Sequence, residues 1–190
     1  MNWKLVLFFI FCLPYGLFAQ KNVVVSLYQS LEKEKMDTNR ITLMCDIGYE
    51  LRVNDPGKAL VITNEALLLA KKIKNIDGQA KSLGTIAIIY RLTGSFPLAL
   101  EYNLKRLKLI EKSSSIRKYA GTLANIGFVY VNLEEYRKAL EYYYKADSVM
   151  RQTDVIDDLN FNLALNLGDV YDKLNMNDSA FSYFTKSLSI

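Results

Sequence analysis

An internal repeat of about forty residues runs through this chain of 190 residues. The segment 80–102 aligns without a gap on the segment 120–142, so that identical residues recur forty positions apart: Ala80, Leu83, Tyr90, Ala99, Leu100, Glu101 and Tyr102. A third copy follows at a shift of 41 residues, and an earlier copy has a linker that is one residue shorter. Four copies at this period predict a solenoid of stacked units, because such units bury their apolar faces only against their neighbours.

Each copy is predicted to contain two helices. In the third copy, Leu123, Gly127 and Tyr130 fall at i, i+4 and i+7, which places them on one helical stripe. A glycine inside a helix costs about 1 kcal/mol relative to alanine. We therefore expect a neighbouring helix to approach closely at Gly127. The small residues Ala139 and Ala146 lie seven apart on one face of the second helix.

The units are expected at residues 39–75, 78–115, 118–153 and 157–190. Two helix starts are marked in the sequence, by Asp55-Pro56 and by Ser95-Phe96-Pro97, since a capping side chain and a proline both favour the first turn. Residues 20–38 are expected to form an N-terminal capping helix, with an amphipathic pattern over residues 22–36.

The repeated motif resembles that of the tetratricopeptide repeat family. The match comprises Gly or Ala, a Tyr three residues later, an aromatic residue, Ala-Leu, and then Tyr and Ala; it is best in residues 120–153 and looser in 40–73 and 161–190. This resemblance implies an all-α, right-handed α-solenoid of antiparallel helix pairs. The forty-residue period and the stretch 37–60 are similar to exported N-terminal repeat regions of bacterial sensor proteins. In those proteins a membrane helix and an output module follow the repeats.

The resemblance also implies where a partner would bind. In the family the first helices line a concave groove that takes a protein or peptide ligand, and the equivalent positions here are Asp46, Tyr49, Thr85, Ile88, Arg91, Asn125, Phe128, Asn166 and Asp169. Asparagine is a poor residue for the middle of a helix, so Asn125 and Asn166 are candidates for gripping a peptide main chain. Solvated amides are the alternative. Likewise Tyr49, Ile88 and Phe128 form either an exposed apolar stripe or packing against an adjacent unit.

The first 19 residues have the order of a secretory signal peptide. Lys4 precedes an apolar run from Leu5 to Leu13, and Ala19 supplies a small residue at the expected cleavage position. The nine apolar residues are short for a spanning helix, which needs about 20. We expect cleavage after Ala19 and a periplasmic or secreted protein, with an uncleaved anchor as the alternative.

Composition excludes several classes of catalytic and metal site. The chain has no histidine and two cysteines, Cys12 and Cys45, so histidine bases, His-containing zinc sites and a disulfide framework are excluded. Its net charge of +4 is too small to indicate nucleic-acid binding. We expect no catalytic residue, no metal, no cofactor and no membrane binding by the repeats themselves. Of the consecutive tyrosines 142–144, at least one is expected to pack between helices, because three such residues cannot share one face.

The last copy has a shorter second helix, from near Asp178 to Ile190. We expect a longer polypeptide in which further repeats or an output module follow. The last unit should then present an unpaired apolar face, formed by Leu163, Leu167, Phe181 and Phe184. The predicted function is a protein- or peptide-binding scaffold in a signal-transduction protein. The alternative is a free-standing exported interaction or assembly protein with no output module.

Overall fold

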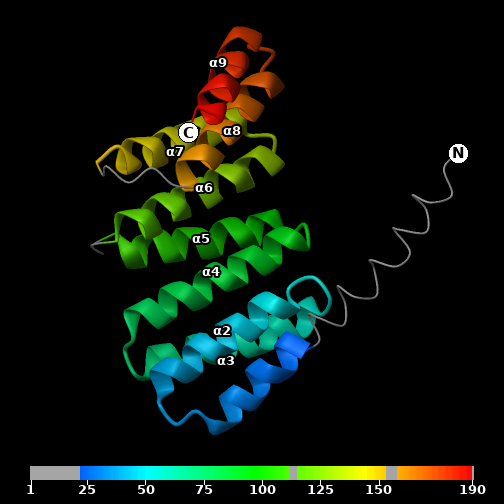
Figure 1. Cartoon of the computed structure of the whole chain (residues 1–190), viewed down its shortest axis with the longest axis vertical. Helices are drawn as coiled ribbons and strands as arrows, with labels where there is room; N and C mark the ends of the chain where they lie inside the picture. Colours follow the sequence, from blue (N-terminus) through cyan, green and yellow to red (C-terminus); the bar gives the residue numbers. More distant parts are fainter. Residues whose placement is uncertain (1–21, 112–114, 153–157, 190) are drawn as a thin grey trace, which may run out of the picture. The chain divides into compact units, whose positions relative to one another are not determined.

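The computed structural model describes residues 22–111, 115–152 and 158–189, which are helical throughout apart from the connecting turns (Figure 1). The expected signal peptide at residues 1–19 lies outside the described residues. A first helix covers residues 22–33. It is followed by α2 (Asp37–Leu51), α3 (Pro56–Lys72), α4 (Ile76–Leu92), α5 (Phe96–Ile110), α6 (Ile116–Asn132), α7 (Tyr136–Met150), α8 (Asp158–Lys173) and α9 (Asn177–Leu188). The predicted all-α fold of helix pairs is confirmed.

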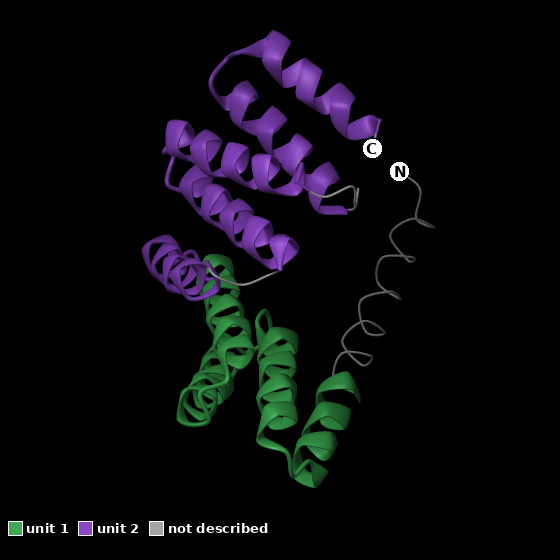
Figure 2. Cartoon of the chain, turned by 90° about the vertical axis from the view of Figure 1, so that its left-hand side faces the viewer, with its two compact units in different colours: residues 1–92 green, residues 93–190 purple. Residues whose placement is uncertain are grey.

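The helices form two compact units, residues 1–92 and 93–190 (Figure 2). In the first unit, α2 packs against α3 and α4, and α3 also packs against α4. In the second unit, α5 packs on α6, α6 on α7, α7 on α8, and α8 on α9, while α6 and α8 are also in contact. The first helices of successive pairs therefore lie beside each other within each unit.

Local sequence explains where the helices begin and turn. Asp55 caps α3 by accepting a hydrogen bond of 3.0 Å from the backbone N–H of Lys58, and Pro56 occupies the first turn, as its sequence predicts. The turns inside three helix pairs need a residue with positive φ. Gly94, Glu134 and Asn175 occupy this place at φ values of 74°, 58° and 57°, so the turns repeat in register with the helices.

The core of the first unit is built on α2. Ile41, Cys45 and Ile47 are at most 1% exposed, and Leu27 and Leu31 of the helix 22–33 pack against their cluster. The first helix thus covers one side of α2 with apolar side chains. Such coverage buries the apolar face of α2 on that side, as a neighbouring repeat would.

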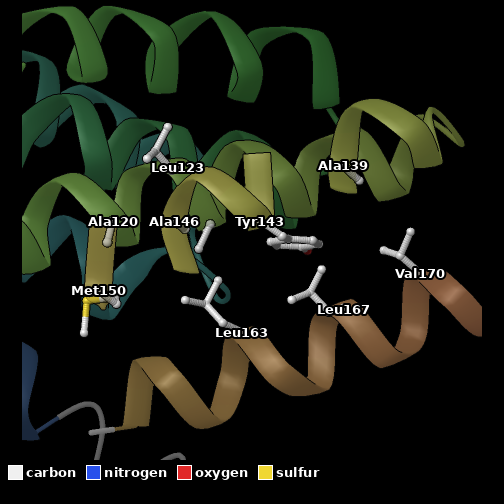
Figure 3. Close-up of a cluster of buried hydrophobic side chains, with 10 residues drawn as sticks. Ala120, Leu123, Ala139, Tyr143, Ala146, Met150, Leu163, Leu167 and Val170 are labelled. Carbon is white, nitrogen blue, oxygen red and sulfur yellow. The ribbon is translucent and has the colours of Figure 1, made fainter. Parts of the chain in front are cut away.

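Tyr143 is the centre of the second unit's core, where its side chain is 1% exposed. Figure 3 shows Leu163, Leu167 and Val170 of α8 pointing toward α7, with Leu167 next to the Tyr143 ring. A Cβ atom placed on Gly127 would lie 2.7 Å from Cε1 of Tyr143, so the glycine admits the ring. This confirms both the close helix approach expected at Gly127 and the packing role expected for one of the three tyrosines.

The apolar face expected on the last unit is smaller than predicted. Leu163 and Leu167 are each 1% exposed, because both belong to the α7–α8 interface, so their assignment to an unpaired face is wrong. Phe181 and Phe184, by contrast, are 74% and 37% exposed on α9, and Leu188 continues their face at 86%. Most of the exposed apolar surface of this repeat therefore lies on the last helix, with Phe161 of α8 at 38% exposure and Met176 at 49% beyond it.

Candidate partner-binding surface

The small residue of each first helix defines which way the predicted groove residues face. Gly48, Gly127 and Gly168 each meet a side chain of the second helix in the same pair. A helix turns by about 100° per residue, so the residues two before and one after each glycine point away from that contact. The nine predicted residues therefore divide into two groups, one on α2 and α4 and the other on α6 and α8.

In the first unit, two of the predicted groove residues are already engaged in polar contacts within the chain. The carboxylate of Asp46 on α2 pairs with Lys81 on α4 at 2.8 Å. Thr85 is 7% exposed and donates its hydroxyl hydrogen bond to the carbonyl of Lys81 in its own helix. The Asp46–Lys81 ion pair thus joins α2 to α4, while Thr85 bonds within its own helix and presents little surface to a partner.

Tyr49 forms the exposed aromatic part of this first group, at 42% exposure. The guanidinium of Arg52 lies 3.6 Å from the centre of its ring, in a cation–π contact. Ile88 and Arg91 on α4 are half-buried. Burial lowers the pKa of Arg91, and the charge of Arg52 lowers it further. The first unit therefore presents an aromatic and cationic surface.

In the second unit the surface is uncharged over most of its length. Asn125, Phe128 and Asn166 are half-buried on α6 and α8, and Asp169 is exposed at the end of the row. The pKa of Tyr143 is raised, first by burial and then by the negative charge of Asp169. Arg117 and Asp158 join the beginnings of α6 and α8 through an ion pair of 2.7 Å.

The amides of Asn125 and Asn166 differ from those of four other asparagines in the helices. In α3, α5, α6 and α8 an asparagine Nδ2 donates to the carbonyl four residues earlier, at 2.6–3.0 Å: Asn64, Asn103, Asn132 and Asn162. Asn125 and Asn166 make no side-chain hydrogen bond with the described part of the chain. Both amides consequently retain their full capacity to donate and accept.

A cluster of tyrosine hydroxyls was not predicted from the sequence. The hydroxyl of Tyr144 on α7 is hydrogen-bonded to that of Tyr171 on α8, and it accepts a second hydrogen bond of 3.2 Å from Tyr183 on α9. The rings of Tyr171 and Tyr183 stack with centroids 5.5 Å apart. The repeat pattern accounts for the stacked pair, because Tyr130 and Tyr142 stack in the same way one repeat earlier. The position of Tyr144 beside that pair depends on how α7 packs against α8 and α9.

The described residues contain no group of three or more acidic, cysteine or histidine side chains placed to hold a metal ion. None of the helices in these residues combines the length and the apolar character that crossing a membrane requires.

The comparisons with known proteins address the family and the fold. A family model described as tetratricopeptide repeat matches residues 119–190. No curated protein sequence matches the chain.

Solved structures with similar folds share little sequence with this chain. BtubC (BKLC) from P. vanneervenii superposes with a TM-score of 0.77 at 16% identity, over 90% of this chain and 72% of that one. A Rap protein complexed with competence and sporulation factor gives 0.78 at 15% identity, over 90% of this chain and 50% of that one. A signal-transduction ATPase of the STAND class with a tetratricopeptide repeat sensor, from Pyrococcus horikoshii, gives 0.78 at 17% identity over 89% of this chain and 27% of that one. These likenesses show a shared solenoid fold, and this chain spans half or less of the last two proteins.

Proposed function

The chain is a tetratricopeptide-repeat scaffold of the protein-interaction type, and from this premise we propose that the first helices of its second unit bind an extended protein or peptide segment. The observation that carries the proposal is the pair of unengaged amides at Asn125 and Asn166 on the adjoining helices α6 and α8. An amide that donates and accepts matches the N–H and C=O groups of a peptide main chain.

The half-buried ring of Phe128 supplies the apolar part of this surface. It lies one turn along α6 from Asn125 and is partly accessible to a ligand. Covering such a ring completely would contribute about 1.5–3 kcal/mol. Each amide hydrogen bond would add about 1 kcal/mol net. Together these contacts support a moderate affinity, which suits a scaffold that recognises a segment reversibly.

The test is capture of partners from an extract of the source organism by two double variants. Asn125→Ala with Asn166→Ala should weaken binding about tenfold to a hundredfold, since two hydrogen bonds of about 1 kcal/mol each are lost. The matched control is Asn132→Ala with Asn162→Ala on the same helices, whose amides donate to carbonyls of their own helices. Equal capture by both double variants, with unchanged melting curves, would place the partner elsewhere.

We further propose that the scaffold is exported and forms the sensory or interaction region of a signalling protein. The apolar run and the small residue at Ala19 support export. The STAND protein of similar fold carries its tetratricopeptide repeats as a sensor, which supports a sensory role. Mass spectrometry of the N-terminus in the native host should find Gln20 first, and a mature protein that begins at Met1 contradicts export by cleavage.

The second candidate is a free-standing exported interaction or assembly protein. BtubC, whose fold is similar, matches over 72% of its length, which supports a protein that consists mostly of such repeats. Sequencing the gene beyond codon 190 separates the two. A membrane helix and an output module downstream support the signalling protein, and an immediate stop codon supports the second candidate.

A further inference from the structure

Three tyrosine side chains of the second unit meet at their hydroxyl groups. The hydroxyl of Tyr144 on α7 is hydrogen-bonded to that of Tyr171 on α8, and Tyr183 on α9 donates to the same oxygen at 3.2 Å. The rings of Tyr171 and Tyr183 are nearly parallel, with 11° between their planes. Three helices of one compact unit therefore contribute one phenolic oxygen each to a single cluster.

The hydrogen-bonding capacity of the three hydroxyls is not exhausted within the cluster. In the described part of the chain they hydrogen-bond only to one another. Three O–H donors share two hydrogen bonds, so one donor and most of the oxygen lone pairs are left for a ligand or for water. The side chain of Tyr144 is 39% exposed, so the cluster is open to solvent on the side of this residue.

The spacing of the oxygens suits a small cation. Around an octahedral ion with bonds of about 2.0–2.1 Å, neighbouring oxygen ligands lie about 2.9 Å apart. The oxygens of Tyr144 and Tyr183 are 3.2 Å apart, and that of Tyr171 is within hydrogen-bond distance of Tyr144. A cation beside Tyr144 can therefore contact all three oxygens after small rotations of the side chains.

Charge decides which cation fits. Burial, and then the hydrogen bonds to Tyr171 and Tyr183, raise the pKa of Tyr144, so its hydroxyl keeps its proton at neutral pH in the absence of a metal. A bound ion must displace such protons, and a high charge on the ion lowers the pKa of an oxygen ligand most strongly. Three phenolates are neutralised completely by a trivalent ion, whereas Mg²⁺ would leave a net negative charge in a partly buried place. Lys186 lies over the Tyr183 ring, but its charge is offset by Asp147 at 3.7 Å.

We propose that Tyr144, Tyr171 and Tyr183 form a binding site for ferric iron, with their phenolate oxygens as the ligands. Three Fe–O bonds form, three phenolic protons leave to solvent, and no electron is transferred. No metal is expected from the sequence, because these tyrosines form no ligand motif there and their oxygens meet only in the folded chain. Bound iron ties α9 to α7 and α8 and so stabilises the last two helices. The site uses none of the residues proposed to bind a peptide, so the two functions can fail separately.

The test is titration of the full chain with ferric nitrilotriacetate. Phenolate bound to Fe³⁺ gives a visible ligand-to-metal charge-transfer band, which distinguishes the complex from the protein alone and from the chelate alone. We expect a saturable band and a higher melting temperature, because a ligand that binds only the folded state stabilises it. Ga³⁺, which has the same charge and no such band, should also raise the melting temperature and should compete with iron. Mg²⁺ should do neither.

Phenylalanine variants locate the site. Tyr144→Phe keeps the ring and removes the shared hydroxyl. Changes to the surroundings of a metal cost about 10–100-fold in affinity, so loss of a direct ligand should weaken iron binding by at least about a hundredfold. Tyr171→Phe and Tyr183→Phe should act similarly, so the test does not depend on the folding of one variant. The matched control is Tyr142→Phe on the same helix, whose ring stacks on Tyr130 at 5.4 Å and whose hydroxyl lies outside the cluster.

Three outcomes overturn the proposal. One is the absence of a charge-transfer band in the wild-type chain at saturating chelate. Another is a band of unchanged strength and affinity in Tyr144→Phe, which would mean that iron adheres to tyrosines elsewhere. The last is an equal loss of the band in Tyr142→Phe, which would show that the response is not specific to the cluster.

Discussion

Two glycines of helix α6 should respond in opposite directions to the same substitution by alanine. A Cβ at Gly127 would lie 2.7 Å from Cε1 and 2.8 Å from Cδ1 of Tyr143, and that ring is 1% exposed. A Cβ at Gly121 would meet nothing within 4 Å. Both residues belong to one helix, so the gain in helix propensity is the same at the two positions. Any difference in stability between the two variants is therefore due to the Tyr143 ring next to Gly127.

The expected magnitudes follow from two opposing contributions. Replacing glycine by alanine inside a helix stabilises it by about 1 kcal/mol. Inserting a methyl group into a filled core costs about 1–3 kcal/mol. Gly121→Ala should therefore raise the free energy of unfolding by up to about 1 kcal/mol, while Gly127→Ala should lower it by about 1 kcal/mol. For a chain of this length, this difference of about 2 kcal/mol corresponds to about 4–8 °C between the melting temperatures of the two variants.

The assay is thermal unfolding by circular dichroism, with Gly168→Ala as a third variant. At Gly168 the added Cβ would lie 2.5 Å from Cε1 of Phe184, an even closer contact than at Gly127. Phe184 is 37% exposed, however, so its ring has room to move aside. The melting temperatures should rank Gly121→Ala above Gly168→Ala above Gly127→Ala. Equal stabilities of Gly121→Ala and Gly127→Ala would refute the argument that Gly127 is required by the Tyr143 ring.

Three further predictions concern other parts of the chain. Asp55→Ala should lower the melting temperature; because hydrogen bonds from Lys58 lower the pKa of Asp55, its stabilising effect is present above about pH 4 and is lost as the pH falls, so wild type and variant should converge in acid melts. Burial raises the pKa of the Cys45 thiol, so iodoacetamide should label it slowly in native protein and rapidly in urea. For the same reason the free energy of unfolding should decline as the pH rises through about 8.5, where the thiol of the unfolded chain ionises. Phe181→Lys with Leu188→Lys should reduce light scattering at high concentration and leave the melting temperature nearly unchanged, because both side chains are largely exposed.

The repeat pattern predicted the helices and the close contacts inside a pair. Gly127 and Tyr143 lie within one helix pair, so their packing follows from helix periodicity and from the size of the two side chains. The Asp46–Lys81 ion pair joins helices of different pairs, and its geometry depends on how α2 and α4 are stacked. Leu163 was misassigned for the same reason. Its partner is α7 of the preceding pair, and a sequence pattern does not show which face that helix covers.

Hydrogen bonds divide the asparagines into two groups, those whose amides bond to their own helix and those whose amides do not, and the repeat pattern alone does not show this division. Asn103 of α5 occupies the position that Tyr143 fills in the next repeat, and its Nδ2 is committed to its own helix. Asn125 and Asn166 occupy positions that point away from the second helices, and their amides remain uncommitted. A residue that breaks the packing pattern and a residue that lies outside it are therefore different kinds of candidate. The first is committed to its own helix, so its replacement by an apolar residue should change the stability of the fold. Replacement of the second by alanine should change recognition alone.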